Sequence, residues 1–154
     1  RHPHLYGDGE HRSWEAMKAS TRASIADGLP ASLPTLHRAF RLQERAAGVG
    51  FDWDDTEGPA RKVEEELGEV RKELASNSAT REQLEDELGD LLFACINLCR
   101  RAGVHPALAL DRATDKFARR FERVEALARE RGIVLTDAGI TVLDALWDEV
   151  KLAE

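Results

Sequence analysis

Apolar residues recur every three or four positions along most of this chain from Ser32 onward. In the stretch 63–74, for example, Val63, Leu67, Val70 and Leu74 follow one another at this spacing. Such a period places apolar side chains on one face of a helix, whereas a half-buried strand would alternate every second residue. We therefore expect an all-α fold, with four main helices packed as a four-helix bundle.

Turn and cap residues divide this helical pattern into segments. Gly48 and Gly50 follow the first segment, Gly103 follows the third and Gly132 follows the fourth, since glycine is common just past a helix end. Thr80 and Gln83 have the spacing of a capping box at the start of the third segment. The expected helices cover residues 34–47, 59–75, 81–101, 106–131 and 140–152, with Pro59 and Pro106 in the first position of theirs. Gly132–Leu135 is a weak candidate for a strand.

Composition narrows the classes of protein. The 154 residues carry a net charge of −7, which argues against nucleic acid as the main partner. No apolar run approaches the roughly 20 residues that a membrane span needs. Cys95 and Cys99 are the only cysteines and lie in an apolar stretch, so we interpret them as core residues in a reducing, cytoplasmic compartment.

The first 31 residues differ from the rest in being rich in Gly, His, Ser and Pro. We interpret residues 1–31 as a leader or linker left from a preceding domain, with a short helical candidate at Trp14–Ser20, and residues 32–154 as one helical domain. The chain does not begin with Met, so we expect it to be part of a longer protein.

Two acidic segments, 21 positions apart, fit one sequence template. Residues 64–70 read EEELGEV and residues 85–91 read EDELGDL. At about 100° per residue, the carboxylates of both segments lie about 60° and 120° to the same side of the apolar stripe of their helix. Those carboxylates belong to Glu66, Glu69, Glu87 and Asp90. The glycine in each segment is expected to allow close packing of helices.

Four carboxylates beside a half-buried seam would repel one another and would be costly to desolvate. A divalent cation removes both costs, and ligands that are all oxygen favour Mg²⁺ or Mn²⁺. The alternative is that these residues are solvated charges on helix flanks. The repetition at equal offsets favours a metal site.

The expected helices 81–101 and 106–131 carry other polar residues of interest. Asn97 continues the line of Glu87 and Asp90, where it either binds a ligand or satisfies a nearby helix end. Lys116 and Arg120 lie on one face of the segment 106–131, at the i, i+4 spacing, and could contact phosphate.

These residues resemble the MazG family of nucleoside triphosphate pyrophosphohydrolases. The family motif EExxE followed by ExxD corresponds to EELGE at 65–69 and ELGD at 87–90. The segments VGFDW at 49–53, EDELGDLLFACINLCR at 85–100, ATDKFARRFERV at 113–124 and LDALWDEVK at 143–151 are similar to the carboxy-terminal half of two-domain MazG proteins. RHPHLYGD at 1–8 is similar to the end of the preceding half.

The resemblance implies an all-α pyrophosphatase fold that forms a homodimer. It implies that the four carboxylates bind Mg²⁺ and that Glu65 holds a further metal or activates water. Lys116 and Arg120 are implied to bind the triphosphate. Residues with a less direct claim to the substrate site are Lys62, Asn97, Trp53 and Trp147. Each tryptophan either stacks on a base or serves as a core or subunit-contact aromatic.

The reaction implied is hydrolysis of a nucleoside triphosphate to the monophosphate and pyrophosphate, by water activated on metal and directed at the α-phosphorus. The chain has no Gly-rich phosphate loop. A di-iron carboxylate bundle is disfavoured because neither motif contains Glu-x-x-His. The remaining alternative is a non-catalytic helical dimerisation half of a larger protein. The sequence does not indicate which nucleotide is preferred.

Overall fold

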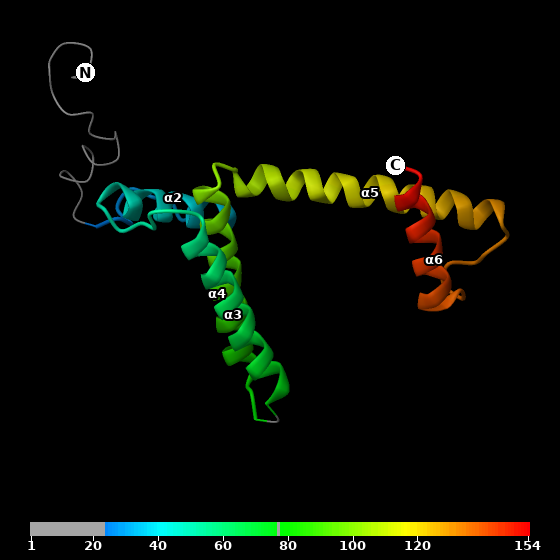
Figure 1. The fold of residues 1–154 in the computed structure, drawn as a ribbon, viewed down its shortest axis with the longest axis horizontal. Coiled ribbons are helices and arrows are strands. Elements are labelled where there is room, and N and C mark those ends of the chain that lie inside the picture. The colour runs from blue at the N-terminus through cyan, green and yellow to red at the C-terminus, as the bar shows by residue number, and fades with distance from the viewer. Residues whose placement is uncertain (1–23, 77) are drawn as a thin grey trace, which may run out of the picture. The chain divides into compact units, whose positions relative to one another are not determined.

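The computed structural model describes residues 24–76 and 78–154. Within these ranges it has the helices α2 (Thr35–Gly48), α3 (Glu57–Ala75), α4 (Arg81–Arg101), α5 (Pro106–Glu130) and α6 (Gly139–Leu152) and no strand, which confirms the all-α prediction (Figure 1). None of these helices combines the length and the apolar character needed to cross a membrane. The helical candidate at Trp14–Ser20 and most of the predicted leader lie outside the described residues.

The start of α4 is the predicted capping box. The backbone N–H of Gln83 donates to the Thr80 hydroxyl at 3.2 Å, and the Gln83 side-chain oxygen accepts from the backbone N–H of Thr80 at 2.8 Å. These two bonds satisfy backbone donors that have no partner within the helix. They fix the residue at which α4 begins.

The start of α3 differs from the prediction by two residues. The helix begins at Glu57, so Pro59 is its third residue and not its first. The Asp55 carboxylate accepts from the backbone N–H groups of Glu57 at 3.0 Å and Gly58 at 3.2 Å. With this local cap the helix begins two residues earlier than predicted. Pro59 is tolerated there because the N–H groups in the first turn of a helix have no partners within the helix.

The segment Gly132–Leu135 is a turn, so its assignment as a weak strand candidate was wrong. Gly132 has a φ of 65°, and the backbone N–H of Ile133 donates to the carbonyl of Ala128 at 2.8 Å. This left-handed glycine ends α5 and reverses the chain toward α6. Ile133 and Leu135 then pack on the apolar core formed by these two helices.

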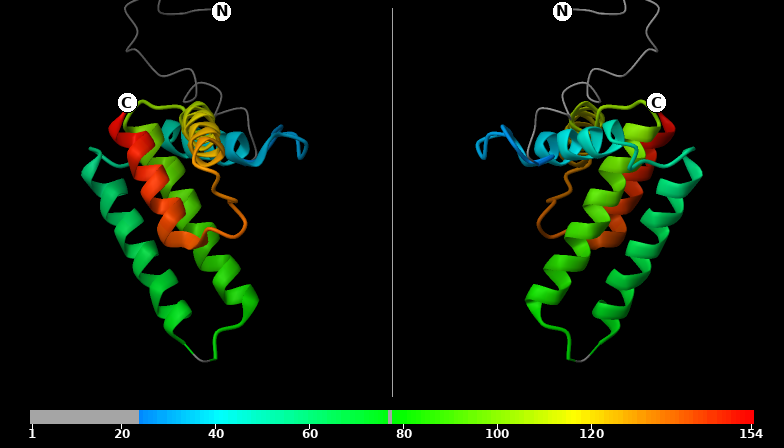
Figure 2. Two further views of the ribbon diagram at one scale, coloured as in Figure 1. Left: turned by 90° about the vertical axis from the view of Figure 1, so that its right-hand side faces the viewer. Right: turned by 90° about the vertical axis from the view of Figure 1, so that its left-hand side faces the viewer.

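The structure consists of two units, which are described separately. The first unit ends at Ala107 and contains α2, α3 and α4. In it, α3 and α4 lie side by side and antiparallel, and α4 also packs against α2 (Figures 1 and 2). The side-chain amide of Gln43 on α2 donates to the carbonyl of Phe93 on α4 at 2.8 Å.

The apolar stripe predicted on α3 is only partly buried. Val70 is 4% exposed, but Leu67 is 37% and Leu74 66% exposed, whereas Glu66 is only 7% exposed. The helix is therefore rotated relative to the prediction, because α4 covers the flank that carries Glu66. Leu67 and Leu74, which the periodicity placed in the core, are exposed instead.

On α4, burial is also narrower than predicted. Ala94 and Ile96 are buried, while Leu88, Leu92 and Phe93 are between 41% and 62% exposed. Within the first unit, α2 and α3 cover only part of the surface of α4.

The second unit, Leu108–Glu154, consists of most of α5 and of α6. Its core is formed by Val124, Ala128, Leu146 and Val150, each at most 3% exposed. The predicted stripe on α5 is buried only in this second half of the helix. Nearer its start, the exposed large apolar residues are Leu108, Leu110, Phe117 and Phe121.

We predict that Thr80→Ala lowers the free energy of unfolding by about 1 kcal/mol, because it removes the N-cap acceptor of α4. Chemical denaturation followed by circular dichroism measures this change. The matched control is Thr141→Ala, at an exposed helical position of α6, which should be neutral or slightly stabilising. Equal stabilities of the two variants would contradict the role of this cap.

Candidate metal centre and adjoining cavity

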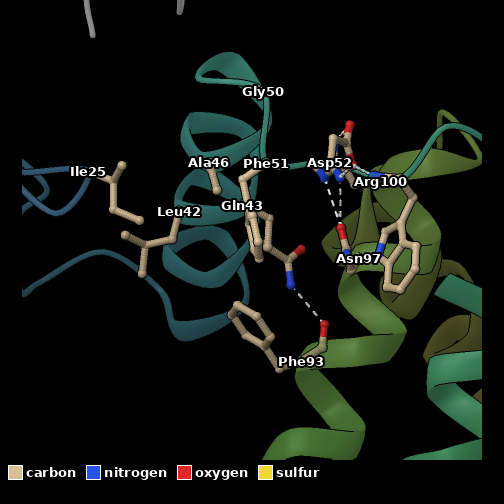
Figure 3. A pocket seen from close by; sticks show the side chains of 11 residues that line it. Ile25, Leu42, Gln43, Ala46, Gly50, Phe51, Asp52, Phe93, Asn97 and Arg100 are labelled. Atoms are coloured by element: carbon tan, nitrogen blue, oxygen red, sulfur yellow. Dashed lines mark hydrogen bonds and ion pairs between the residues drawn. The ribbon is translucent and has the colours of Figure 1, made fainter. Parts of the chain in front are cut away.

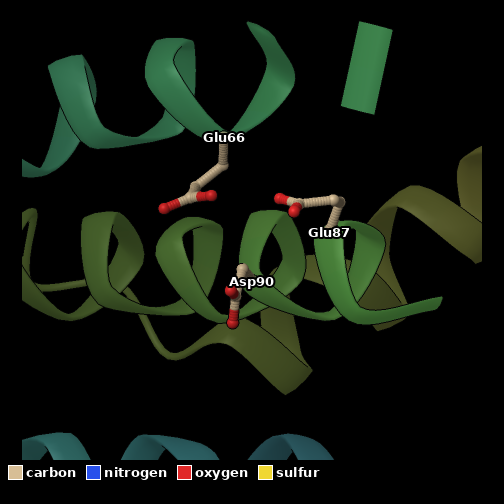
Figure 4. A group of neighbouring side chains, drawn as sticks. All are labelled: Glu66, Glu87 and Asp90. Carbon is tan, nitrogen blue, oxygen red and sulfur yellow. The ribbon is translucent and has the colours of Figure 1, made fainter. Parts of the chain in front are cut away.

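Three carboxylates meet at the seam between α3 and α4. Glu66 on α3 and Glu87 and Asp90 on α4 each offer an oxygen, and these oxygens all lie within 4.8 Å of one another (Figure 4). Glu66 is buried, Glu87 is half-buried and Asp90 is exposed. Glu87 and Asp90 come together because residues three apart are neighbours on a helix surface. The structure thus assembles three of the four carboxylates predicted to bind metal.

The crowding of negative charge perturbs Glu87. Its pKa is raised above the ordinary value, mainly by desolvation and then by the charges of Glu69, Glu66 and Asp90. A raised carboxyl pKa means that the ionised form is disfavoured where it stands. The three carboxylates therefore have too little positive charge near them to balance their negative charge.

Lys62 supplies part of that positive charge. Its Nζ lies 2.5 Å from an oxygen of Glu66 and 2.8 Å from an oxygen of Glu65. Hydrogen bonds to Glu65 and then to Glu66 raise the pKa of this ammonium group. Lys62, predicted as a contributor to the substrate site, is thus placed beside the buried carboxylate of the candidate metal centre.

Glu65 and Glu69 do not join the three carboxylates. Glu65 is exposed and is paired with Lys62, while an oxygen of Glu69 lies 2.5 Å from the Nζ of Lys72. Glu69 is nevertheless close enough for its charge to raise the pKa of Glu87. The metal role of Glu69 and the metal or water-activating role of Glu65 stay predictions.

The expected close packing at the glycines of the two acidic segments was wrong for the described residues. A Cβ atom added to Gly68 or Gly89 would meet no atom within 4 Å. Neither glycine lies where α3 approaches α4. We find no structural reason for either glycine in this chain.

The donor set fits a hard divalent cation. It consists of carboxylate oxygens from two helices, and one of the three groups is buried where an unpaired charge is costly. Oxygen ligands are those that Mg²⁺, Mn²⁺ and Ca²⁺ prefer. A cation here would also relieve the repulsion that raises the pKa of Glu87.

A cavity of about 510 Å³ adjoins α4 on the side of α2 (Figure 3). It is lined by Ile25, Leu42, Gln43, Ala46, Gly50, Phe51, Asp52, Trp53, Phe93, Asn97 and Arg100. Two of the predicted substrate-site residues, Trp53 and Asn97, are among them. The ring of Trp53 packs directly over Gly58, where an added Cβ would lie 2.3 Å from the ring. Gly58 therefore makes room for Trp53 at the wall of the cavity.

The polar wall of the cavity is an ion-pair network. Arg100 donates from Nη1 to a carboxylate oxygen of Asp52 at 3.0 Å, and its Nε and Nη2 donate to the Asn97 side-chain oxygen at 3.0 and 2.8 Å. The hydrogen bond from Arg100 is the main cause of the lowered pKa of Asp52. This network attaches the loop before α3 to the last turn of α4.

Lys116, Arg120 and Trp147 belong to the second unit. Arg120 donates from Nε and Nη2 to one oxygen of Glu154, at 2.9 and 2.6 Å, and lies 5.9 Å from the centre of the Trp147 ring. Trp147 also packs against Phe117 and the core of this unit, which supports its structural interpretation. The predicted roles of Lys116 and Arg120 toward the triphosphate stay predictions.

Sequence reasoning missed Gln43, Asp52 and Arg100. For Gln43 a signal was available, since it follows Phe40 by three positions and precedes Ala47 by four, on the apolar face of its helix. A polar residue at such a position indicates a specific partner. The pairing of Asp52 with Arg100 joins residues 48 positions apart and had no local signal.

We predict that Glu87→Gln raises the melting temperature when divalent cations are absent, because it removes one of the repelling charges. The native chain should gain about 5–10 °C from Mg²⁺ at a hundredfold excess over its dissociation constant, and the variant should gain much less. Thermal unfolding with EDTA and with Mg²⁺ measures both effects. The control Glu64→Gln, on an exposed part of α3, should respond like the native chain.

The Asp52–Arg100 pair predicts a pH dependence. The pKa of Asp52 is lower in the folded state than in the unfolded state. Its contribution to the free energy of unfolding is therefore fully present above the unfolded pKa of about 4 and is lost as the pH falls through the folded-state pKa. Asp52→Asn should therefore cost about 1–2 kcal/mol at neutral pH and less at a pH of about 3. Urea unfolding at both pH values tests this, with Asp54→Asn in the same loop as control. A cost that does not change with pH would contradict it.

Comparisons with known proteins match the segment that contains α3 and α4. Residues 56–125, which include α3 and α4, match the family model described as the MazG nucleotide pyrophosphohydrolase domain. The chain is 39% identical over 166 residues to the nucleoside triphosphate pyrophosphohydrolase of Escherichia coli (strain K12), an alignment covering 100% of this chain and 63% of that protein.

A second relative is the nucleoside triphosphate pyrophosphohydrolase/pyrophosphatase MazG of Thermotoga maritima, 42% identical over 158 residues, covering 98% of this chain and 60% of that protein. The uncharacterized protein YabN of Bacillus subtilis is 38% identical, over 100% of this chain and 34% of its own length. The chain thus spans about three fifths or less of the relatives it matches. The family model and these relatives support the resemblance to the MazG family that the two acidic motifs indicated.

Proposed function

We propose that this chain hydrolyses nucleoside triphosphates to nucleoside monophosphate and pyrophosphate with the help of Mg²⁺ or Mn²⁺. The observation that carries the proposal is the meeting of Glu66, Glu87 and Asp90 at one seam beside an aromatic-lined cavity. The similarity to proteins named nucleoside triphosphate pyrophosphohydrolases supports the same reaction.

The three carboxylates would hold the cation. When bound, a divalent cation supplies positive charge to the phosphate oxygens and lowers the pKa of water, which are the two needs of this reaction. Lys62 forms an ion pair with the buried Glu66 and offsets part of its charge. Glu69 would join as a fourth ligand by leaving Lys72, since an exposed ion pair of this kind contributes little.

In the proposed reaction, water attacks the α-phosphorus and the bond from that phosphorus to the oxygen bridging to the β-phosphorus breaks. Pyrophosphate leaves with the bridging oxygen, and the monophosphate keeps the oxygen of water. Glu65 is a candidate to accept the proton of water, and Lys116 and Arg120 are candidates to bind phosphate oxygens. No nucleophilic side chain takes part.

The cavity would hold the nucleoside. Asn97 follows Asp90 by seven positions on α4, or about 10 Å along the helix, so the two residues lie on one face. That separation suits a nucleotide whose phosphates reach the carboxylates while its base reaches the cavity. Trp53 offers a flat ring at the cavity wall, 44% exposed, on which a base could stack.

A homodimer is part of the proposal. The exposed residues Leu67, Leu74, Leu88 and Leu92 on α3 and α4 support it, because burial at a subunit contact would remove this apolar surface from water. The same surface is what a non-catalytic dimerisation half of a larger protein would need. Measurement of activity decides between the two functions. That the chain corresponds to the carboxy-terminal half of a two-domain protein likewise remains proposed.

We predict that Asp90→Asn lowers kcat/KM for pyrophosphate release at least about 100-fold, because it removes a ligand oxygen charge. Glu69→Ala should also lower it, if Glu69 is the fourth ligand. The control Glu64→Gln, outside the seam, should keep native activity. Several triphosphates are assayed with Mg²⁺. Absence of pyrophosphate from all of them, or native activity in Asp90→Asn, would contradict the proposal.

Hydrolysis in ¹⁸O-labelled water tests the site of attack. We expect the label in the nucleoside monophosphate and none in pyrophosphate, because the α-phosphorus is attacked. Mass spectrometry of both products measures it. Label in pyrophosphate would show attack at the β-phosphorus and would require a different placement of the substrate.

A further inference from the structure

The side-chain oxygen of Gln43 is a buried acceptor that has no hydrogen-bond partner in the described part of the chain. Gln43 is 6% exposed and lines the cavity beside α4 (Figure 3). Its Nε2 donates to the carbonyl of Phe93 at 2.8 Å, which fixes the orientation of the amide group. The oxygen is therefore held in place without a donor.

This arrangement has a cost that folding alone does not explain. A buried polar atom left unsatisfied costs about 1–3 kcal/mol, and native proteins keep few of them. The neighbouring cavity walls are apolar, formed by Ile25, Leu42, Ala46 and Phe51, and offer the oxygen no side-chain donor. A ligand that carries an N–H group would satisfy it.

Asn97, one of the other polar residues that line the cavity, restricts the kind of ligand further. The Asn97 oxygen accepts from Arg100, and the Asn97 amide nitrogen makes no hydrogen bond within the described ranges, so it can donate to a ligand. Gln43 thus contributes an acceptor and Asn97 a donor. Between aromatic side chains, such a pair suits a flat heterocycle with an amine next to a ring nitrogen.

We propose that Gln43 determines base specificity, with its Oε1 accepting a hydrogen bond from the exocyclic amine of adenine or cytosine. The proposal rests on the proposed function, because it takes the cavity as the nucleoside site. The ring of Phe51, 83% exposed, lines the same cavity and is drawn with it in Figure 3.

Calorimetric binding of nucleoside monophosphates tests the proposal without hydrolysis. AMP is compared with purine riboside monophosphate, and CMP with 2-pyrimidinone riboside monophosphate, since each second compound lacks only the amine. The native chain should bind AMP or CMP about tenfold more tightly than its partner compound. A ratio near one for both pairs, or no binding of either amine-bearing nucleotide, would overturn the proposal.

Variants of Gln43 assign the effect to its oxygen. Gln43→Met should reduce the ratio to about one, because methionine offers no oxygen to accept a hydrogen bond from the amine. Leu42→Met alters an apolar wall and should change both compounds of a pair equally. An unchanged ratio in a folded Gln43→Met would overturn the role of Gln43. Loss of pyrophosphate release with the ratio intact would instead contradict only the proposed reaction.

Discussion

The first unit depends on a balance of charge at the seam between α3 and α4. Glu66 is buried there, at 7% exposure, and lies opposite Glu87 and Asp90. A buried position on an amphipathic helix is ordinarily occupied by an apolar residue. Lys62 offsets part of the charge, yet the pKa of Glu87 remains raised. A cation bound at this seam would offset the remaining negative charge and stabilise the folded state.

The sequence predicted the helices well because their signals are local. The capping box of Thr80 and Gln83 and the turn at Gly132 each involve residues a few positions apart. The rotation of α3 was not predictable in this way. Glu66 and not Leu67 is buried on the side of α4. Which of the two is buried depends on the ion pair with Lys62 and on the packing of α4, and the apolar periodicity of α3 contains no information on either.

The same distinction applies to the site. A shared template at equal helical offsets predicted which carboxylates could meet, and three of the four do. Asp52 and Arg100 were missed because they are 48 positions apart in sequence, and the partner of Gln43 could not be predicted because it lies 50 positions away. These three residues help to line the cavity in which we propose that the nucleoside binds. The proposed base specificity therefore depends on tertiary contacts and not on the acidic motif.

Electron paramagnetic resonance of Mn²⁺ tests the central claim most directly, because it measures cation binding without substrate. We predict that the native chain lowers the signal of free Mn²⁺ by binding the ion, and that added Mg²⁺ restores this signal by competing for the site. Glu66→Gln should weaken Mn²⁺ binding by at least about tenfold. Equal binding of Mn²⁺ by the native chain and a folded Glu66→Gln, or no binding by the native chain, would contradict the claim that this seam is a metal centre.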